Sequence, residues 1–284
     1  MRYLITGKNG QLAQAFIKRL EVQSHDVIAP EKSAADITNI DAMRQQVNLS
    51  RPHVIINCAA YNAVDTAEKD KEKAFHVNSE GPRVLAELAR ETGASIVHFG
   101  SDYVFDGTKE TGLYVEQDST NPLNEYGKSK LAGEINVRNA NDRHLVLRLS
   151  WVFGEGKQNF IHKLLEWSSK NEYLKISCDE FSVPTYTETV VDVTLEALRR
   201  ELTGVFHLTN SGYCSRYEWA SFILWEKGIN KFIRPVHMDA FPQPAKRPAF
   251  SAMDNGSLRR LLGITIPDWR DDVRKFLRSG VDKK

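Results

Sequence analysis

The sequence has few cysteines and no long apolar stretch. Its three cysteines, Cys58, Cys178 and Cys214, are far apart and lack a paired metal-ligand spacing. No run approaches the ~20 apolar residues of a membrane-spanning helix, and the N-terminus lacks the charged-then-apolar layout of a signal peptide. We therefore expect a cytoplasmic protein with buried, reduced thiols and no membrane partner.

Net charge and repeats are also missing. The chain has 38 basic and 37 acidic residues, so nothing favours a nucleic-acid partner, and small molecules are the expected ligands. No internal repeat or low-complexity tract is visible. A length of 284 residues suits one large domain, or a nucleotide-binding domain with a smaller appended lobe.

Short apolar runs alternate with helical patterns up to about residue 150. We expect strands at 2–6, 26–29, 53–60, 95–99 and 145–149, and helices at about 40–48, 65–75, 78–92 and 125–138. This order is typical of an α/β protein with a doubly wound parallel sheet, the Rossmann fold, whose ligands gather at the carboxyl ends of the strands.

The texture changes after Ser150, where prolines interrupt shorter helical segments at about 158–169, 187–200 and 217–227. We expect residues 1–150 to form a nucleotide-binding domain. Residues 151–284 are expected to form mainly a smaller substrate lobe, with some segments returning to the first domain.

A glycine turn joins the first strand to the first helix in the run from Gly7 to Ala13. Gly7 permits a tight bend, Gly10 lets backbone amides approach a pyrophosphate, and Ala13 stands where dinucleotide-binding turns often have a third glycine. A glycine-rich turn between any strand and helix is the alternative. The position directly after the first strand favours the dinucleotide-binding interpretation.

Ser101, Tyr126 and Lys130 follow one another in the order that a carbonyl reductase uses. If 125–138 is helical, Tyr126 and Lys130 lie on one face, where the ammonium can lower the pKa of the phenol. The Tyr–Lys pair alone is a weak signal, and Ser101 alone fits a turn after a strand. Together with the glycine turn, the three residues predict hydride chemistry.

With both motifs in place, the chain resembles the extended short-chain dehydrogenase/reductase family, and within it the reductases of dTDP-linked 4-keto-6-deoxy sugars. The segments that carry the likeness are 7–12, 57–61, 64–65, 101–107, 126–134, 148–154, 184–185 and 247–251. Ser101 stands where the family most often has Thr, and Gly100 where it usually has Ser. The hydroxyl is kept, so activity is still expected.

The resemblance implies NADPH or NADH as cofactor, a dTDP-sugar as substrate, and hydride transfer to C4 of the sugar. Tyr126 would donate the proton, Ser101 would hydrogen-bond the carbonyl oxygen, and Lys130 would hold the nicotinamide ribose. The cofactor-binding residues implied are Gly7, Gly10, Gln11, Leu12, Asp36, Ile37, Ala59, Ala60, Tyr61, Asn62, Asn78, Phe99, Tyr126 and Lys130. Those implied for the substrate are Val64, Ser101, Asp102, Tyr103, Trp151, Asn159 and Arg247.

Three of these side chains have a second interpretation. Trp151 is either a pocket wall or ordinary core packing. Arg247 is either a two-bond clamp on a diphosphate or a solvated charge, and Asn78 is either a helix cap or a cofactor contact.

Other functions compete with reduction. A dehydratase of the same family typically has Glu after the aspartate, whereas Tyr103 follows Asp102 here. A non-catalytic NADP-binding subunit, similar to the regulatory subunit of methionine adenosyltransferase, is the alternative from another class. Glu31 and Lys32 leave the choice between NADPH and NADH open. No carboxylate cluster supports Mg²⁺, and both a monomer and a homodimer fit the sequence.

Overall fold

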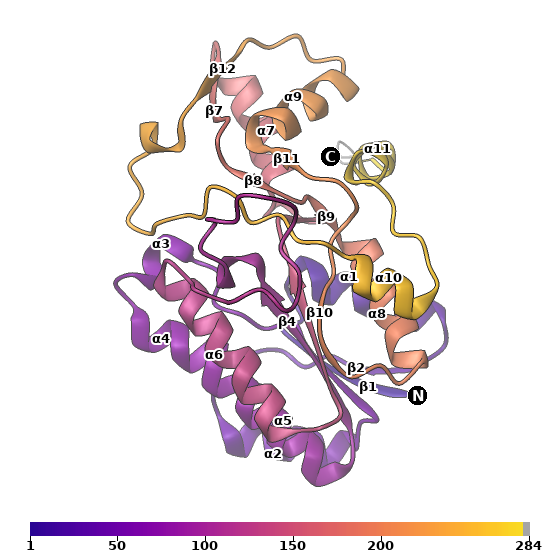
Figure 1. Cartoon of the computed structure of the whole chain (residues 1–284). Helices are drawn as coiled ribbons and strands as arrows, with labels where there is room; N and C mark the ends of the chain where they lie inside the picture. Colours follow the sequence, from indigo (N-terminus) through magenta and orange to yellow (C-terminus); the bar gives the residue numbers. More distant parts are fainter. Residues whose placement is uncertain (281–284) are drawn as a thin grey trace.

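A six-stranded sheet forms the centre of the protein in the computed structural model, which describes residues 1–280 (Figure 1). Its strands are β1 (Arg2–Thr6), β2 (Asp26–Ile28), β3 (Val54–Asn57), β4 (Ser95–Ser101), β5 (His144–Leu149) and β10 (Gly204–His207). They lie in the order β10-β5-β4-β3-β1-β2, and every neighbouring pair is parallel. The five strands predicted from the apolar runs are all present.

Helices cover both faces of the sheet because alternate residues of each strand point to opposite sides. In β1, Tyr3 and Ile5 join the apolar core on one face, and Leu4 joins the core on the other. The first core is closed by α1 (Gln11–Val22), α8 (Thr187–Arg199) and α10 (Gly256–Leu262), and the second by α2 (Ile40–Ser50), α5 (Gly81–Thr92) and α6 (Glu125–Ala140). The predicted doubly wound Rossmann fold is confirmed.

The prediction of one helix over residues 65–75 is wrong. That stretch contains two short helices, α3 (Val64–Ala67) and α4 (Lys71–Phe75), because the backbone of Asp70 leaves the helical region with φ −103° and ψ 48°. A π-helical turn, η1 (His76–Glu80), then joins α4 to α5. Pro82 has no N–H to continue an α-helical ladder at this point.

A second set of elements packs around its own apolar core, which includes Phe153, Trp219 and Phe276. The elements that contribute to this core are β6 (Val152–Phe153), α7 (Phe160–Lys170), β7 (Leu174–Ser177), β9 (Thr185–Tyr186), β11 (Cys214–Ser215), α9 (Arg216–Glu226), β12 (Ile233–Val236) and α11 (Trp269–Arg278). Strand β8 (Phe181–Ser182) pairs with β11, and the 3-10 turn η3 (Met238–Ala240) follows β12. In Figure 1, α7, α9, β7 and β12 lie beyond the carboxyl ends of the strands of the large sheet. The three helices predicted after Ser150 correspond to α7, α8 and α9.

The order in which the chain adds strands to the sheet reverses at β1, since β2 lies on one side of β1 and β3 lies on the other. Parallel sheets bind ligands in the crevice outside the carboxyl ends of the strands at such a point. The residues that follow β1, β3, β4 and β5 therefore define where a ligand is expected.

Candidate functional site

The turn after β1 brings two backbone segments into close contact. Gly7 has φ +71°, and a Cβ atom built on it would lie 2.7 Å from the backbone nitrogen of Ala59. The N–H of Gly10 donates to the carbonyl of Gly7 at 2.8 Å, and Gly10 is the N-cap of α1. Only glycine fits at position 7, and the turn directs the positive end of the α1 dipole into the crevice.

Two adjoining cavities of about 370 and 360 Å³ lie at the carboxyl ends of the strands, and both are lined by Gly10, Ala59 and Ala60. Of the predicted site residues, the first cavity is lined by Gly10, Gln11, Leu12, Ala59, Ala60, Asn62, Val64, Phe99, Ser101, Asp102, Tyr103, Tyr126, Lys130 and Trp151. The second adds Gly7, Asp36 and Ile37. The two cavities form one elongated site, which fits the two-part shape of a dinucleotide.

Helix α6 carries Tyr126 and Lys130 and is held closely against its neighbours. Asn124 caps its start by accepting the N–H of Gly127 at 2.8 Å. A Cβ atom on Gly127 would lie 2.3 Å from the carbonyl oxygen of Tyr103, and one on Gly133 would lie 2.0 Å from that of Asn78. The helix axis is therefore fixed, and with it the two side chains that face the cavity.

Tyr126 and Lys130 differ from expectation in their electrostatics. We expected Lys130 to lower the pKa of the Tyr126 phenol, but burial raises that pKa to about 12, and a hydrogen bond with Ser101 offsets it only partly. The ammonium of Lys130 instead donates to the carbonyl oxygen of Phe99 at 2.6 Å. The phenol is protonated at neutral pH, which is the form that a proton donor needs.

Asp102 follows Ser101 in the 3-10 turn η2 (Asp102–Val104) and is fully buried. One carboxylate oxygen accepts the hydroxyl of Ser101 at 3.2 Å. The other accepts those of Ser182 at 2.9 Å and Ser251 at 2.6 Å. Burial raises the pKa of Asp102 to about 6, although all three hydroxyls favour the ionised form.

Trp151 combines the two roles proposed for it, because its ring lines the cavity and also packs on Trp219, with ring centroids 5.6 Å apart. The guanidinium of Arg216 lies 3.5 Å from the centre of the Trp151 ring. Trp151 has φ +38°, which is unusual for a bulky residue, and its indole N–H is buried without a hydrogen-bond partner. Strain and an unused donor at one residue indicate a ligand-facing position.

Four predicted residues do not line either cavity: Tyr61, Asn78, Asn159 and Arg247. Asn78 lies within the π-helical turn and binds the N–H and C=O of Tyr61, so it supports the loop beside the cavity and is not a helix cap. Asn159 caps α7 by accepting the N–H of His162. Arg247 pairs with Asp65, at 3.0 and 2.7 Å.

Sequence reasoning missed several residues at the site. Gln158 lines both cavities, and Lys8 lines the one that contains Asp36, together with Lys32, which the sequence had already linked to the choice of cofactor. Gln158 carried no motif, since it lies in a loop far along the chain from the glycine turn. Lys8 stood inside that turn, and its charge was the signal that could have identified it.

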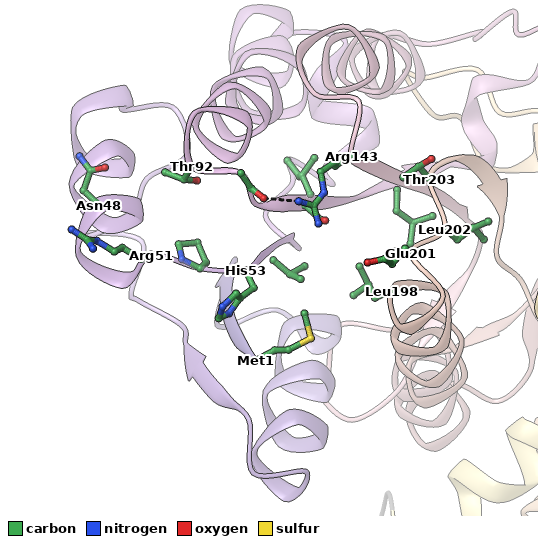
Figure 2. A pocket seen from close by; sticks show the side chains of 16 residues that line it. Met1, Asn48, Arg51, His53, Thr92, Arg143, Leu198, Glu201, Leu202 and Thr203 are labelled. Atoms are coloured by element: carbon green, nitrogen blue, oxygen red, sulfur yellow. Dashed lines mark hydrogen bonds between the residues drawn. The ribbon is translucent and has the colours of Figure 1, made fainter.

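A larger cavity of about 1030 Å³ lies at the other end of the strands. Figure 2 shows its lining, which includes Met1 before β1, His53 before β3 and Arg143 before β5. These positions mark the amino ends of the strands. No predicted site residue lines this cavity, so the carboxyl-end site is the candidate functional site.

Two features are absent from residues 1–280. No helix in this part of the chain is both long and apolar enough to span a membrane. The same residues contain no group of three or more His, Cys, Asp or Glu side chains arranged to hold a metal ion.

Comparisons with known proteins match the chain over nearly its full length. The family model described as the RmlD substrate binding domain matches residues 1–281. A dTDP-4-dehydrorhamnose reductase of Burkholderia thailandensis is 35% identical, and the match covers 98% of this chain and 99% of that protein.

Two solved structures are also similar to this chain over nearly its full length. A dTDP-4-dehydrorhamnose reductase of Clostridium acetobutylicum is 36% identical, with a TM-score of 0.94 and coverage of 98% of this chain and 99% of that chain. One from Bacillus anthracis, in complex with NADP, is 33% identical with the same TM-score and coverage.

Proposed function

The chain belongs to the RmlD family of dTDP-4-dehydrorhamnose reductases, and we propose that it reduces dTDP-4-dehydro-β-L-rhamnose to dTDP-β-L-rhamnose with a nicotinamide cofactor. The observation that carries the proposal is the meeting of Ser101, at the end of β4, with Tyr126 and Lys130, on α6, in one cavity beside the glycine turn. These residues come from two elements and still line one space.

The site fits a dinucleotide. The absence of a side chain at Gly7 and the start of α1 make a cradle of backbone N–H groups suited to a diphosphate. Asp36 and Ile37 line the cavity on the adenosine side, while Phe99, Tyr126 and Lys130 line the other. A bound reduced nicotinamide supplies the hydride for the C4 carbonyl.

The residues of the chain manage the proton and the developing charge. Tyr126 donates its phenolic proton to the carbonyl oxygen as that oxygen becomes an alkoxide. Ser101 lines the same cavity, and its hydroxyl, which donates to Asp102 in the free protein, turns to donate to the same oxygen and stabilises its charge. Lys130 would bind the ribose hydroxyls of the cofactor, and its ammonium is held at this end of the cavity by the carbonyl oxygen of Phe99.

The substrate side of the cavity is formed by Val64, Asp102, Tyr103 and Trp151. The ring of Tyr103 meets that of Tyr126 edge to face, with centroids 5.7 Å apart. Aromatic rings next to the proton donor suit the faces of a deoxysugar or thymine base. The dTDP-sugar therefore lies between Trp151 and the catalytic hydroxyls in our proposal.

The test follows loss of nicotinamide absorbance with purified protein, NADPH or NADH, and the dTDP-4-keto sugar made in place. Tyr126→Phe should lower kcat by about a hundredfold to ten-thousandfold while cofactor binding is retained. Tyr114→Phe is the control, because it removes a buried phenol outside the site. If the wild type binds cofactor but never turns over, the reductase proposal fails and the regulatory-subunit alternative replaces it.

A further inference from the structure

Glu134 is a buried carboxylate directly behind the catalytic residues. It lies four residues after Lys130 on α6, one helical turn further on, and only 1% of its surface is exposed. Its Oε2 atom lies 3.0 Å from both Nε and Nη2 of Arg148, which is also buried. A buried carboxylate needs such a partner to remain ionised.

The second oxygen of Glu134 has no hydrogen-bond partner and lies against β4. A Cβ atom built on Gly100 would be 2.2 Å from this Oε1 atom, so the carboxylate occupies the space that a side chain at position 100 would take. The neighbouring residue of the strand, Phe99, accepts the hydrogen bond of Lys130. Glu134 and Lys130 thus reach consecutive residues of one strand from consecutive turns of one helix.

Other ionisable groups around Lys130 are neutral. Burial raises the pKa of the Cys58 thiol, and burial lowers the pKa of His98 well below its usual value. Tyr126 is a neutral phenol, as shown above. Burial also raises the pKa of the Glu134 carboxyl, but the guanidinium of Arg148 opposes that rise and favours the ionised form. Among the residues that the structure describes, Glu134 is then the negative charge next to Lys130, since the two side chains reach Gly100 and Phe99 of one strand.

Arg148 is held in place on its other side by neutral groups. Its Nη1 atom lies 3.4 Å from Nε2 of His207, and its guanidinium lies 5.3 Å from the centre of the Phe105 ring. Burial lowers the pKa of His207 to about 3, so the imidazole is neutral and its Nε2 accepts. Arg148 therefore fixes the Glu134 carboxylate without a competing anion.

We propose that Glu134, held by Arg148, is a positioning residue that keeps Lys130 charged beneath the cofactor. It touches neither cofactor nor substrate and acts through Lys130. The link from Lys130 to cofactor binding rests on the proposed function, but the effect of Glu134 on Lys130 does not.

The test measures the protonation of Lys130 directly. Lysines carrying ¹³C at the ε-carbon are titrated by NMR in the full-length protein, and Lys130→Arg identifies the Lys130 signal. Burial lowers the wild-type pKa of Lys130 to about 8. In Glu134→Gln the midpoint should fall by about one unit or more, because an opposite charge has been removed.

Two further variants make the result decisive. Asp272→Asn, which neutralises a buried carboxylate in α11, is the matched control and should leave the midpoint unchanged. Because Glu134→Gln leaves a buried guanidinium unpaired, Glu134→Gln/Arg148→Met provides a second, apolar background that folds more readily. A wild-type midpoint in either Glu134 variant, or a shift in Asp272→Asn, would overturn the proposal.

NADPH titrations of the same proteins connect this effect to the cofactor. Glu134→Gln should bind NADPH as tightly as the wild type well below the midpoint, and about fivefold more weakly at the wild-type midpoint, where half of the wild-type Lys130 but only about a tenth of the variant's is charged. An equal loss at every pH would instead indicate a merely structural role. If the wild type binds no NADPH, the proposed function fails, while the NMR titration still decides the role of Glu134.

Discussion

The guanidinium of Arg247 holds both carboxylate oxygens of Asp65, with Nη1–Oδ1 and Nη2–Oδ2 distances of 3.0 and 2.7 Å. This two-bond geometry is the one that a guanidinium also offers to phosphate. Asp65 therefore binds the two guanidinium nitrogens that, in one interpretation of the sequence, would bind the diphosphate of the substrate. The pair joins α3 to the segment that contains Ala245, whose N–H also donates to Asp65.

The first prediction concerns this pair. Arg247→Met should raise KM for the dTDP-sugar about tenfold, because a charge-assisted contact is lost, with little change in kcat. Asp65→Asn should lower KM by about twofold to threefold, because it frees the guanidinium. Steady-state kinetics with varied sugar nucleotide check both values. If the pair only anchors the loop, both variants will raise KM.

The second prediction concerns Gly7. Gly7→Ala should abolish cofactor binding, because its Cβ would meet backbone atoms of Cys58 and Ala59 that cannot move away. Gly93→Ala is the matched control, since Gly93 has nearly the same φ, +73°, with open space around it. Both variants carry the left-handed strain of roughly 1–2 kcal/mol, and Gly7→Ala adds an overpacking cost of about 1–3 kcal/mol.

Urea unfolding and NADPH titration separate the two contributions. Gly93→Ala should be less stable than the wild type and still bind NADPH. Equal loss of stability in the two variants, with binding intact in both, would show that the contact between Gly7 and Ala59 does not shape the site.

The third prediction concerns the pH dependence of stability. The pKa of Asp102 is raised to about 6, so between about pH 4 and 6 the folded protein keeps a proton that the unfolded chain has released. The contribution of Asp102 to the free energy of unfolding therefore falls as pH rises through this window. Asp102→Asn removes this contribution.

Chemical denaturation of the two proteins across that window provides the measurement. The difference in stability, variant minus wild type, should grow with rising pH by an amount on the order of 1–3 kcal/mol. A constant difference would mean that Asp102 has an ordinary pKa in the folded protein.

The fourth prediction concerns the cofactor. Lys8 and Lys32 line the cavity that contains Asp36, while Glu31 is bound by Lys8 and Asn9, each at 2.9 Å. A basic group near the adenosine 2′-position accepts the phosphate of NADPH. We expect NADPH to be preferred, and Lys32→Ala to weaken NADPH binding by about threefold to tenfold. Fluorescence titration with NADH is the control, and equal weakening of both cofactors would contradict this assignment.

The fold followed from local patterns to a large extent. Strands buried on both faces appear as continuous apolar runs such as the one that forms β3. The helix predicted over 125–138 starts at the same residue as α6 and ends two residues before it. Two features escaped prediction. The break at Asp70 depends on backbone angles that no pattern marks. Some segments after residue 150 were expected to return to the first domain, but the pairing of β10 with β5 is a long-range contact, so the sequence did not identify which segment returns.

The candidate site likewise contains features that the sequence could reveal and contacts that it could not. Residues within one motif, such as Ser101 and Tyr126, line the cavity at the carboxyl ends of the strands. Contacts between distant segments were invisible in the sequence, because their partners lie far apart: Ser182 and Ser251 reach Asp102 from 80 and 149 residues away. Asn159 shows the reverse case, since an Asn before an apolar helix is a cap signal that the sequence already contained.

The pairing of β10 with β5 has a consequence for how the protein is made. Residues 204–207 complete the sheet that begins at residue 2, so a nascent chain that has emerged only as far as β5 has an open strand edge. That edge is closed only after the intervening residues, with Trp151 and all of α7 and α8 among them, have been synthesised. Vectorial synthesis thus leaves the longer strand β5 as the edge of the sheet until more than two-thirds of the chain has been translated, when the shorter strand β10 takes that place.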